Sequence, residues 1–256
     1  MTILFIGDIF GRTGRRLLKD NLKKIIEKYK IDFTIANGEN SAGGIGITKE
    51  IYTELISYGI DVITLGNHAW AQKQIFDFID DANRLVRPAN YPYGTPGKPY
   101  VIIESKGKKI AVINLCGRVF MDCLECPFKT ADKILNEIEK KADIIILDFH
   151  AEATSEKVAM GWYLDGRVSA VLGTHTHVQT ADERVLPKGT GYITDVGMTG
   201  PINSVLGVKK DIIIKKFLTS LPSKFEAAED SGQINGVILG INDDNLVSYI
   251  NRLKIS

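Results

Sequence analysis

The run Thr-Ile-Leu-Phe-Ile-Gly-Asp at residues 2–8 decides the fold class. Its apolar and partly β-branched residues predict a buried strand over Thr2–Gly7, which ends at the carboxylate of Asp8. Leucine and isoleucine then recur at helical spacing within Arg15–Lys28, so this segment is predicted to be an amphipathic helix. A buried strand followed by such a helix begins a βαβ unit. The start of the chain therefore predicts an α/β fold with a largely parallel sheet.

Strands and helices continue to alternate on both sides of an irregular segment at residues 87–99, which holds four of the eight prolines. One domain over residues 1–256, built from two sheets, is the simplest interpretation. Further strands are predicted at Asp32–Ala36, Asp61–Leu65, Tyr100–Glu104, Lys109–Leu115, Asp143–Phe149, Val168–Leu172, Gly191–Asp195, Gly236–Ile241 and Leu246–Asn251. Further helices are predicted at Thr48–Ser57, Gln72–Ile79, Asp132–Lys140 and Ile212–Leu218.

The composition is that of a globular protein with a sizeable core, since 44% of the 256 residues are hydrophobic and 25% are charged. Lysine and arginine number 32 against 31 acidic residues, so no bulk field attracts nucleic acid or a membrane, and any anion recognition must be local. No apolar run reaches the roughly 18 residues of a membrane helix, and the first residues lack the charged start of a signal peptide. We therefore expect a cytoplasmic protein without a membrane partner.

The cysteines are Cys116, Cys123 and Cys126, and an odd number argues against a disulfide scaffold. Cys123 and Cys126 have the spacing of half a tetrahedral zinc site, with Cys116 as the nearby candidate for a third ligand. We favour free thiols in or near a loop, because the histidines are better used elsewhere.

Potential metal ligands follow the carboxyl ends of five predicted strands. In open parallel sheets this edge is where ligands bind. The chain has four histidines, and each of them follows such a strand. The residues at these ends are Asp8, Glu39, Asn40, Asn67, His68, His150, His175 and His177.

The number of candidates predicts two metal ions. In extended backbone, residues i and i+2 point to the same side, so His175 and His177 are expected to face one site. A single metal needs only three or four ligands, whereas a pair bridged by Glu39 or Asp8 uses them all. Two divalent ions would exceed the charge of two carboxylates by about two units, which favours an anionic phosphate over a neutral substrate. They could also lower the pKa of a bridging water.

This pattern resembles the calcineurin-like metallophosphoesterases, whose motifs are D-x-H, G-D-x-x-D/N, G-N-H-D/E, a later histidine and G-H-x-H. The matching runs are Gly7-Asp8-Ile9-Phe10, Gly38-Glu39-Asn40, Gly66-Asn67-His68-Ala69, His150 and Gly173-Thr174-His175-Thr176-His177. The chain departs from the motifs at Phe10, Glu39 and Ala69.

Those departures match one branch, the YmdB-type phosphodiesterases, which the chain resembles from end to end. The runs Gly-Asp-Ile-Phe-Gly-Arg, Ala-Asn-Gly-Glu-Asn-Ser-Ala-Gly-Gly, Leu-Gly-Asn-His-Ala-Trp and Thr-Asp-Val-Gly-Met-Thr-Gly-Pro are among those that carry the likeness. The resemblance implies an αββα sandwich and a di-iron or di-manganese centre. It also implies hydrolysis of cyclic nucleotides by a metal-bridging hydroxide, with 2′,3′-cyclic species favoured and 3′,5′-cyclic species possible. It assigns Asp8, Glu39, Asn40 and His177 to one ion, Glu39, Asn67, His150 and His175 to the other, and proton donation to His68.

Two alternatives stay open at this point. A phosphomonoesterase, such as a nucleotidase or a protein phosphatase, needs the same metals. A regulatory or RNA-associated protein could use the site for binding with incidental catalysis, although the balanced charge does not support broad RNA affinity. Nitrogen and oxygen ligands suit iron, manganese, nickel, cobalt or zinc, and a homo-oligomer is possible.

Overall fold

The structure is a computed structural model that describes residues 1–229 and 231–256. The α-helices are α1 (Gly11–Tyr29), α2 (Lys49–Ser57), α3 (Pro127–Glu137), α4 (Thr154–Leu164) and α5 (Lys210–Thr219), and η1 (Lys73–Asp77) is a 3₁₀ helix. The first seven strands are β1 (Thr2–Ile6), β2 (Asp8–Ile9), β3 (Phe33–Asn37), β4 (Val62–Thr64), β5 (Leu85–Val86), β6 (Tyr100–Ser105) and β7 (Lys108–Cys116). The others are β8 (Ile144–His150), β9 (Ala170–Thr174), β10 (Arg184–Val185), β11 (Gly191–Ile193), β12 (Met198–Pro201), β13 (Gly232–Ile241) and β14 (Val247–Ile255).

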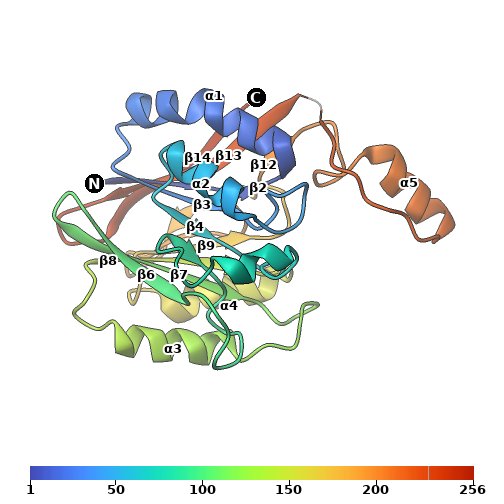
Figure 1. Cartoon of the computed structure of the whole chain (residues 1–256). Helices are drawn as coiled ribbons and strands as arrows, with labels where there is room; N and C mark the ends of the chain where they lie inside the picture. Colours follow the sequence, from blue (N-terminus) through green and yellow to red (C-terminus); the bar gives the residue numbers. More distant parts are fainter. Residues whose placement is uncertain (230) are drawn as a thin grey trace.

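Two sheets pack against each other in the middle of the molecule, and helices cover their outer faces (Figure 1). One sheet has the order β2-β12-β13-β1-β3-β4-β5, with β14 also paired to β13, and the other has the order β10-β11-β9-β8-β7-β6. The helices α1 and α2 lie on the first sheet, whereas α3 and α4 lie on the second (Figure 1). The helix α5 projects away from both layers (Figure 1). The predicted two-sheet αββα sandwich is confirmed.

The alternation of side chains along the strands separates the interior into three apolar layers. In β1, Leu4 and Ile6 pack toward α1 and α2, while Ile3 and Phe5 point between the two sheets. A third cluster joins the second sheet to α3 and α4, with Phe149 and Met160 among its members. Both faces of β1 are buried, which is why the strand is a continuous apolar run. Across the described residues, no helix combines the length and apolar character needed to cross a bilayer.

Parallel strands bring the predicted ligand positions to one edge. The strands β1, β3 and β4 are parallel neighbours in the first sheet, and β7, β8 and β9 are parallel neighbours in the second. Their carboxyl ends therefore share one side of each sheet. Asn37 of β3 donates through Nδ2 to Oδ2 of Asp148 in β8 at 3.0 Å, so the two edges are in direct contact.

The predicted helix at Gln72–Ile79 is wrong, because only the 3₁₀ helix η1 forms there. The Ile75 amide bonds to the carbonyl three residues back at 2.9 Å, and these tighter turns bring Ile75, Phe78 and Ile79 into the core. The helix predicted from residue 132 begins earlier, at Pro127, whose fixed φ suits the first turn.

The first sheet is mixed: among the described residues four of its seven strand pairs are parallel, as the prediction of a largely parallel sheet expects, and the three antiparallel pairs all involve β13. The strands β13 and β14 run antiparallel to their neighbours, and β13 lies between β1 and β12. The sequence also does not predict β2, β5, β10 and β12. Each has two to four residues, which is too short to show a period.

Candidate metal centre

Asp8 enters the site because the chain turns after β1. A Cβ atom at Gly7 would lie 1.9 Å from the carbonyl oxygen of Gly197, so only glycine fits. The Asp8 amide donates to that same oxygen at 3.0 Å, and Asp8 Oδ2 accepts from the His175 amide at 3.2 Å. The other carboxylate oxygen, Oδ1, is buried and has no hydrogen-bond partner among the described residues. A buried acceptor without a donor is costly, and a bound cation would satisfy it.

Glu39 lies at the centre of the site, just beyond the end of β3. Its Oε1 atom is 3.0 Å from Nε2 of His150, at the end of β8 in the other sheet. Its Oε2 atom accepts from the His68 amide at 3.0 Å. A Cβ atom at Gly66 would come within 2.2 Å of Oε2, so a glycine is needed there as well. The Glu39 carboxylate thus lies between the strand ends of both sheets.

Three side chains converge on Nε2 of His150. Oδ1 of Asn67, Oε1 of Glu39 and Nδ1 of His175 lie 3.0, 3.0 and 2.9 Å from it. One ring nitrogen cannot donate to three acceptors, whereas a cation can accept a lone pair from each of them. The ligand atoms of Glu39, His150 and His175 all lie within 4.8 Å of one another. This part of the site is therefore suited to a metal ion.

His177 directs Nε2 toward Asp8 and Asn40. Its Nδ1 atom lies 3.0 Å from the carbonyl oxygen of Leu206, which places the proton on Nδ1 and leaves a lone pair on Nε2. That nitrogen is 3.8 Å from Oδ1 of Asp8 and 3.1 Å from Nδ2 of Asn40. The Asn40 oxygen points instead to Nδ1 of His68 at 2.9 Å. Ligation by Asn40 beside His177 would require its amide to rotate by half a turn.

The expected extended backbone at His175 and His177 is wrong, because their φ values are 103° and 66°. Thr176 lies between them, and its amide and hydroxyl donate to Oδ2 of Asp195 at 3.0 and 2.7 Å. This double contact draws the chain out of the strand as β9 ends. Both rings still reach the site, but a loop positions them.

His68 lies in a turn after β4, and its side chain is 35% exposed, against 0, 21 and 10% for the side chains of His150, His175 and His177. Its ring is held by Asn40 through Nδ1. The His68 ring therefore lies on the more exposed side of the buried Glu39 carboxylate, with Nδ1 3.4 Å from Oε1.

A buried chain of hydrogen bonds supports His150. Its Nδ1 atom lies 2.9 Å from the Thr174 hydroxyl, which donates to Oδ1 of Asp148 at 2.7 Å. With its proton committed to Asp148, the hydroxyl accepts from Nδ1, so Nε2 is the His150 nitrogen that faces the site and can bind a metal once its proton is displaced. Asp148 also accepts from Asn37 and from the Thr64 hydroxyl, both in the first sheet.

The charges of the site favour a cation. Burial raises the pKa of Asp8. Burial also acts on Glu39, but the His150 ring holds its pKa well below the usual range. For His150, the Glu39 carboxylate outweighs burial and raises the pKa to about 9, while burial and His150 lower the pKa of His175 to about 3. The metal-free carboxylates thus hold a proton on His150, which a metal ion would replace.

Comparison with known proteins shows the family to which the chain belongs. A family model described as YmdB-like protein matches residues 4–253. The chain belongs to the YmdB-like family. It is 57% identical over 243 residues to a Bacillus subtilis (strain 168) protein named 2′,3′-cyclic-nucleotide 2′-phosphodiesterase, and the match covers 95% of this chain and 92% of that one.

Solved structures of similar proteins have the same fold. A protein from Thermus thermophilus superimposes with a TM-score of 0.94 at 43% identity, covering 100% of this chain and 99% of that one. A structure described as a novel phosphatase from Mycoplasma pneumoniae gives 0.95 at 35% identity, covering 100% and 93%. The resemblance to the YmdB branch and the metallophosphoesterase type of sandwich are confirmed.

In this YmdB-like chain, the residue types at the site fit divalent metal ions. The donors are carboxylate and amide oxygens and imidazole nitrogens, without a thiolate. The three cysteines are free thiols: Cys116 is buried, Cys123 is exposed to solvent and Cys126 is partly buried. In residues 1–229 and 231–256, the cluster of histidine, cysteine and acidic groups suited to a metal is Glu39, His150 and His175. No cysteine belongs to this cluster of described residues, so the zinc alternative at Cys123 and Cys126 is not supported.

Sequence reasoning missed the buried residues that hold the ligands of this YmdB-like site. Asp148 interrupts the most apolar strand of the chain, and a buried acid in such a run needs partners. That signal could have identified Asp148. No comparable local signal distinguishes Thr174, because its role depends on the neighbouring strand.

Proposed function

We propose that this protein is a dinuclear-metal phosphodiesterase that hydrolyses cyclic nucleotides, with 2′,3′-cyclic species preferred and 3′,5′-cyclic species possible. The class, a phosphoric diester hydrolase, follows from the 57% identity to the Bacillus subtilis phosphodiesterase. The observation that carries the site assignment is the cluster of acceptors around Nε2 of His150 beside the unpartnered Asp8 oxygen. We further propose that residues 1–256 form one metallophosphoesterase domain.

Two divalent ions, iron or manganese according to the resemblance, would be held by both sheets. Asp8, Glu39, Asn40 and His177 would bind one ion, and Glu39, Asn67, His150 and His175 the other. When bound, such a pair supplies a hydroxide nucleophile at neutral pH and offsets the charge of the phosphate. The ligand set brings two carboxylates against four positive charges, so an anionic phosphodiester suits it better than a neutral ester.

His68 would donate the proton that the leaving ribose oxygen needs. Its ring is the most exposed of the four histidines, and Asn40 orients it through Nδ1. A ribose alkoxide is a poor leaving group, so protonation in the transition state is worth roughly 10²–10⁴-fold.

The test is a substrate panel with purified protein loaded with manganese or iron. Adenosine 2′,3′-cyclic phosphate should be hydrolysed faster than the 3′,5′-cyclic isomer and much faster than adenosine monophosphate. Elemental analysis should find close to two metal ions per chain. Faster release of phosphate from the monophosphate would instead identify a phosphomonoesterase.

A further inference from the structure

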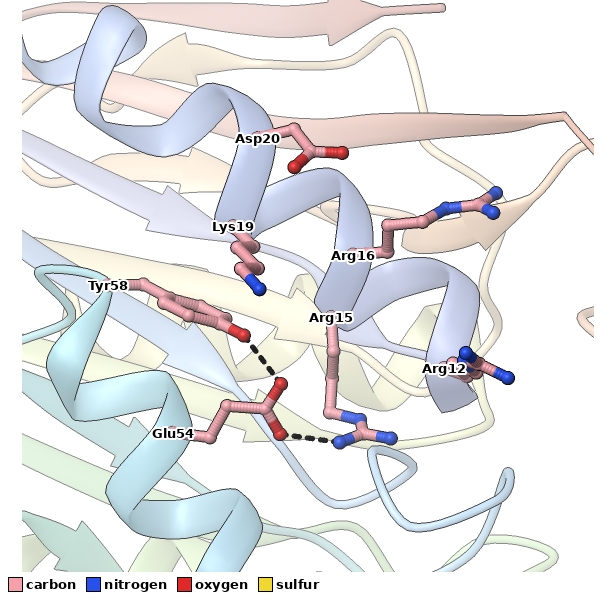
Figure 2. A pocket seen from close by; sticks show the side chains of 7 residues that line it. All are labelled: Arg12, Arg15, Arg16, Lys19, Asp20, Glu54 and Tyr58. Carbon is pink, nitrogen blue, oxygen red and sulfur yellow. Dashed lines mark hydrogen bonds and ion pairs between the residues drawn. The ribbon is translucent and has the colours of Figure 1, made fainter.

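The first half of α1 carries a row of cations. Arg12, Arg16 and Lys19 are one helical turn apart and therefore project from the same side of the helix. A hollow of about 470 Å³ lies between this side and the end of α2 (Figure 2). It is lined by Arg12, Arg15, Arg16, Lys19, Asp20, Glu54 and Tyr58.

One acidic side chain of the hollow is neutralised within it. Glu54 accepts from Nη1 of Arg15 at 2.5 Å and from the Tyr58 hydroxyl at 2.5 Å, and both contacts are visible in Figure 2. Burial and the Glu54 carboxylate raise the pKa of Tyr58 to about 12, so its hydroxyl stays protonated. Arg15 is therefore committed to Glu54.

The other three cations are not committed in this way. Within the described ranges, no ion pair or hydrogen bond joins the side chain of Arg12, Arg16 or Lys19 to another residue. In Figure 2, Lys19 points toward Tyr58, whereas Arg12 and Arg16 point outward, away from Glu54. Asp20 is the remaining acid of this hollow, and Glu229 lines an adjacent hollow with Arg12 and Arg16, so the cations still outnumber the acids. The face thus keeps a net positive charge, although the charge of the whole chain is nearly balanced.

The row begins next to the proposed metal centre. The Gly11 amide donates to the carbonyl oxygen of Asn40 at 2.9 Å, and Arg12 is the following residue. The amino end of α1 adds the positive end of the helix dipole. Positive potential therefore extends from the site along α1, and Arg12 and Lys19 are separated by about 10 Å of helix rise.

We propose that this face of α1 binds the phosphates of an oligonucleotide whose 3′-terminal cyclic phosphate lies at the metal centre. The inference rests on the proposed function and names its substrate class: RNA fragments that end in a 2′,3′-cyclic phosphate. A mononucleotide has a single phosphate, which the metal centre would hold, so it leaves the α1 cations without a ligand. The preceding phosphates of an RNA chain supply regularly spaced negative charges for them.

An anionic membrane is the weaker candidate for this face. Helices that lie on membranes add apolar anchors to their basic residues. None of the exposed large apolar side chains in the described residues lies on α1 or α2. The positive face of α1 therefore lacks the exposed apolar side chains that a membrane-binding helix needs.

The experiment compares a triple variant, Arg12→Gln with Arg16→Gln and Lys19→Gln, with a charge-matched control. The control is Lys133→Gln with Lys140→Gln and Lys141→Gln, which are exposed residues on and just after α3, on the opposite side of the molecule (Figure 1). Arg15 is kept because it pairs with Glu54. Binding of a short 5′-labelled RNA with a 3′-phosphate is followed by fluorescence anisotropy. Hydrolysis is measured in parallel for RNA with a cyclic phosphate end and for adenosine 2′,3′-cyclic phosphate.

Three phosphate contacts predict a slope of about −2 for log affinity against log salt, or roughly a 20-fold loss between 50 and 200 mM salt. In the α1 variant this slope should approach zero, and affinity at low salt should fall at least about 10-fold. Its kcat/KM on the mononucleotide should match that of the wild type. The α3 control should behave as wild type in every assay.

Equal loss of RNA binding in the two triple variants would overturn the inference, because RNA binding would then depend on the total positive charge of the protein and not on the α1 face. It would also be overturned if the α1 variant lost binding to phosphatidylglycerol vesicles while RNA binding stayed unchanged. If the protein hydrolyses the mononucleotide but the α1 variant binds RNA as tightly as the wild type, the proposed function stands and the inference about α1 is wrong. If RNA binding depends on the α1 cations but neither substrate is hydrolysed, the proposed function is wrong, while binding of RNA phosphates to this face of α1 is supported.

Discussion

The Nζ atom of Lys157 lies 2.7 Å from Oδ2 of Asp195, and neither side chain is more than 1% exposed. The same carboxylate accepts from the amide and hydroxyl of Thr176, and its Oδ1 atom accepts from the Gly197 amide at 2.8 Å. Because Thr176 separates His175 from His177, this buried pair anchors the loop that carries two proposed metal ligands.

We expect Asp195→Ala to lower the free energy of unfolding by about 3–5 kcal/mol, because the Lys157 charge would remain buried without a partner. Metal affinity should fall as well, since the loop would lose its anchor. Urea unfolding and a metal titration measure the two effects. The control is Glu226→Gln, which removes a pair with Lys209 in which both side chains are more than half exposed, and it should leave the unfolding midpoint unchanged. If Asp195→Ala unfolded with the same urea midpoint as the wild type, Asp195 would not anchor the loop.

Thr174→Val should weaken metal binding by about 10–100-fold, because His150 would lose the acceptor at Nδ1 that directs Nε2 into the site. Thr174→Ser keeps the hydroxyl and should retain wild-type affinity. Calorimetric titration with manganese gives both values. If the serine and valine variants bound metal equally well, the hydroxyl would not orient His150.

Glu39→Gln should nearly abolish hydrolysis, because the proposed bridging carboxylate supplies half of the anionic ligand charge. Asn40→Ala should be milder, since it removes a neutral ligand from one ion. Steady-state kinetics and metal content are measured for both variants and for Asn67→Ala. A silent Asn40→Ala beside an inactive Asn67→Ala would show that Asn40 orients His68 without binding metal.

The metal-free protein should lose stability as the pH rises. The pKa of His150 is raised from 6.5 to about 9 in the folded protein, so its contribution is complete below about pH 6.5 and is lost as the pH passes 9. The change amounts to about 3 kcal/mol at most. Urea unfolding at pH 6 and pH 9 with a chelator measures it, and His150→Gln should flatten the dependence. A wild-type stability that rises over this range would contradict the assignment.

His68→Ala should lose roughly 10²-fold or more on a cyclic nucleotide and much less on a bis-p-nitrophenyl diester. The nitrophenolate leaves readily as an anion, whereas a ribose alkoxide needs the proton that His68 would supply. Metal content should match the wild type. Equal losses on the two substrates, together with loss of metal, would make His68 a ligand instead of a proton donor.

The sequence was sufficient to predict which residues come together at one edge of the two sheets, because local patterns record burial. A continuous apolar run such as β1 indicates a strand covered on both faces, and the polar residue that ends it marks the carboxyl edge of the sheet. Asp8, Glu39 and His150 could be predicted in this way. The four histidines were informative because each follows such a run.

The tertiary structure decided how those residues are held, since that depends on contacts between segments distant in sequence. Thr176 and Asp195 lie on different strand connections, and their hydrogen bonds impose the positive φ values that place His175 and His177. The register of β8 against β9 sets His150 opposite Thr174, and Asp148, two residues earlier in β8, accepts from the Thr174 hydroxyl. Arg15 and Arg16 are adjacent and chemically identical, yet among the described residues Arg15 is the one that pairs with Glu54 of α2. The packing of α1 against α2 decides which of the two cations is paired, and that packing cannot be read from the local sequence.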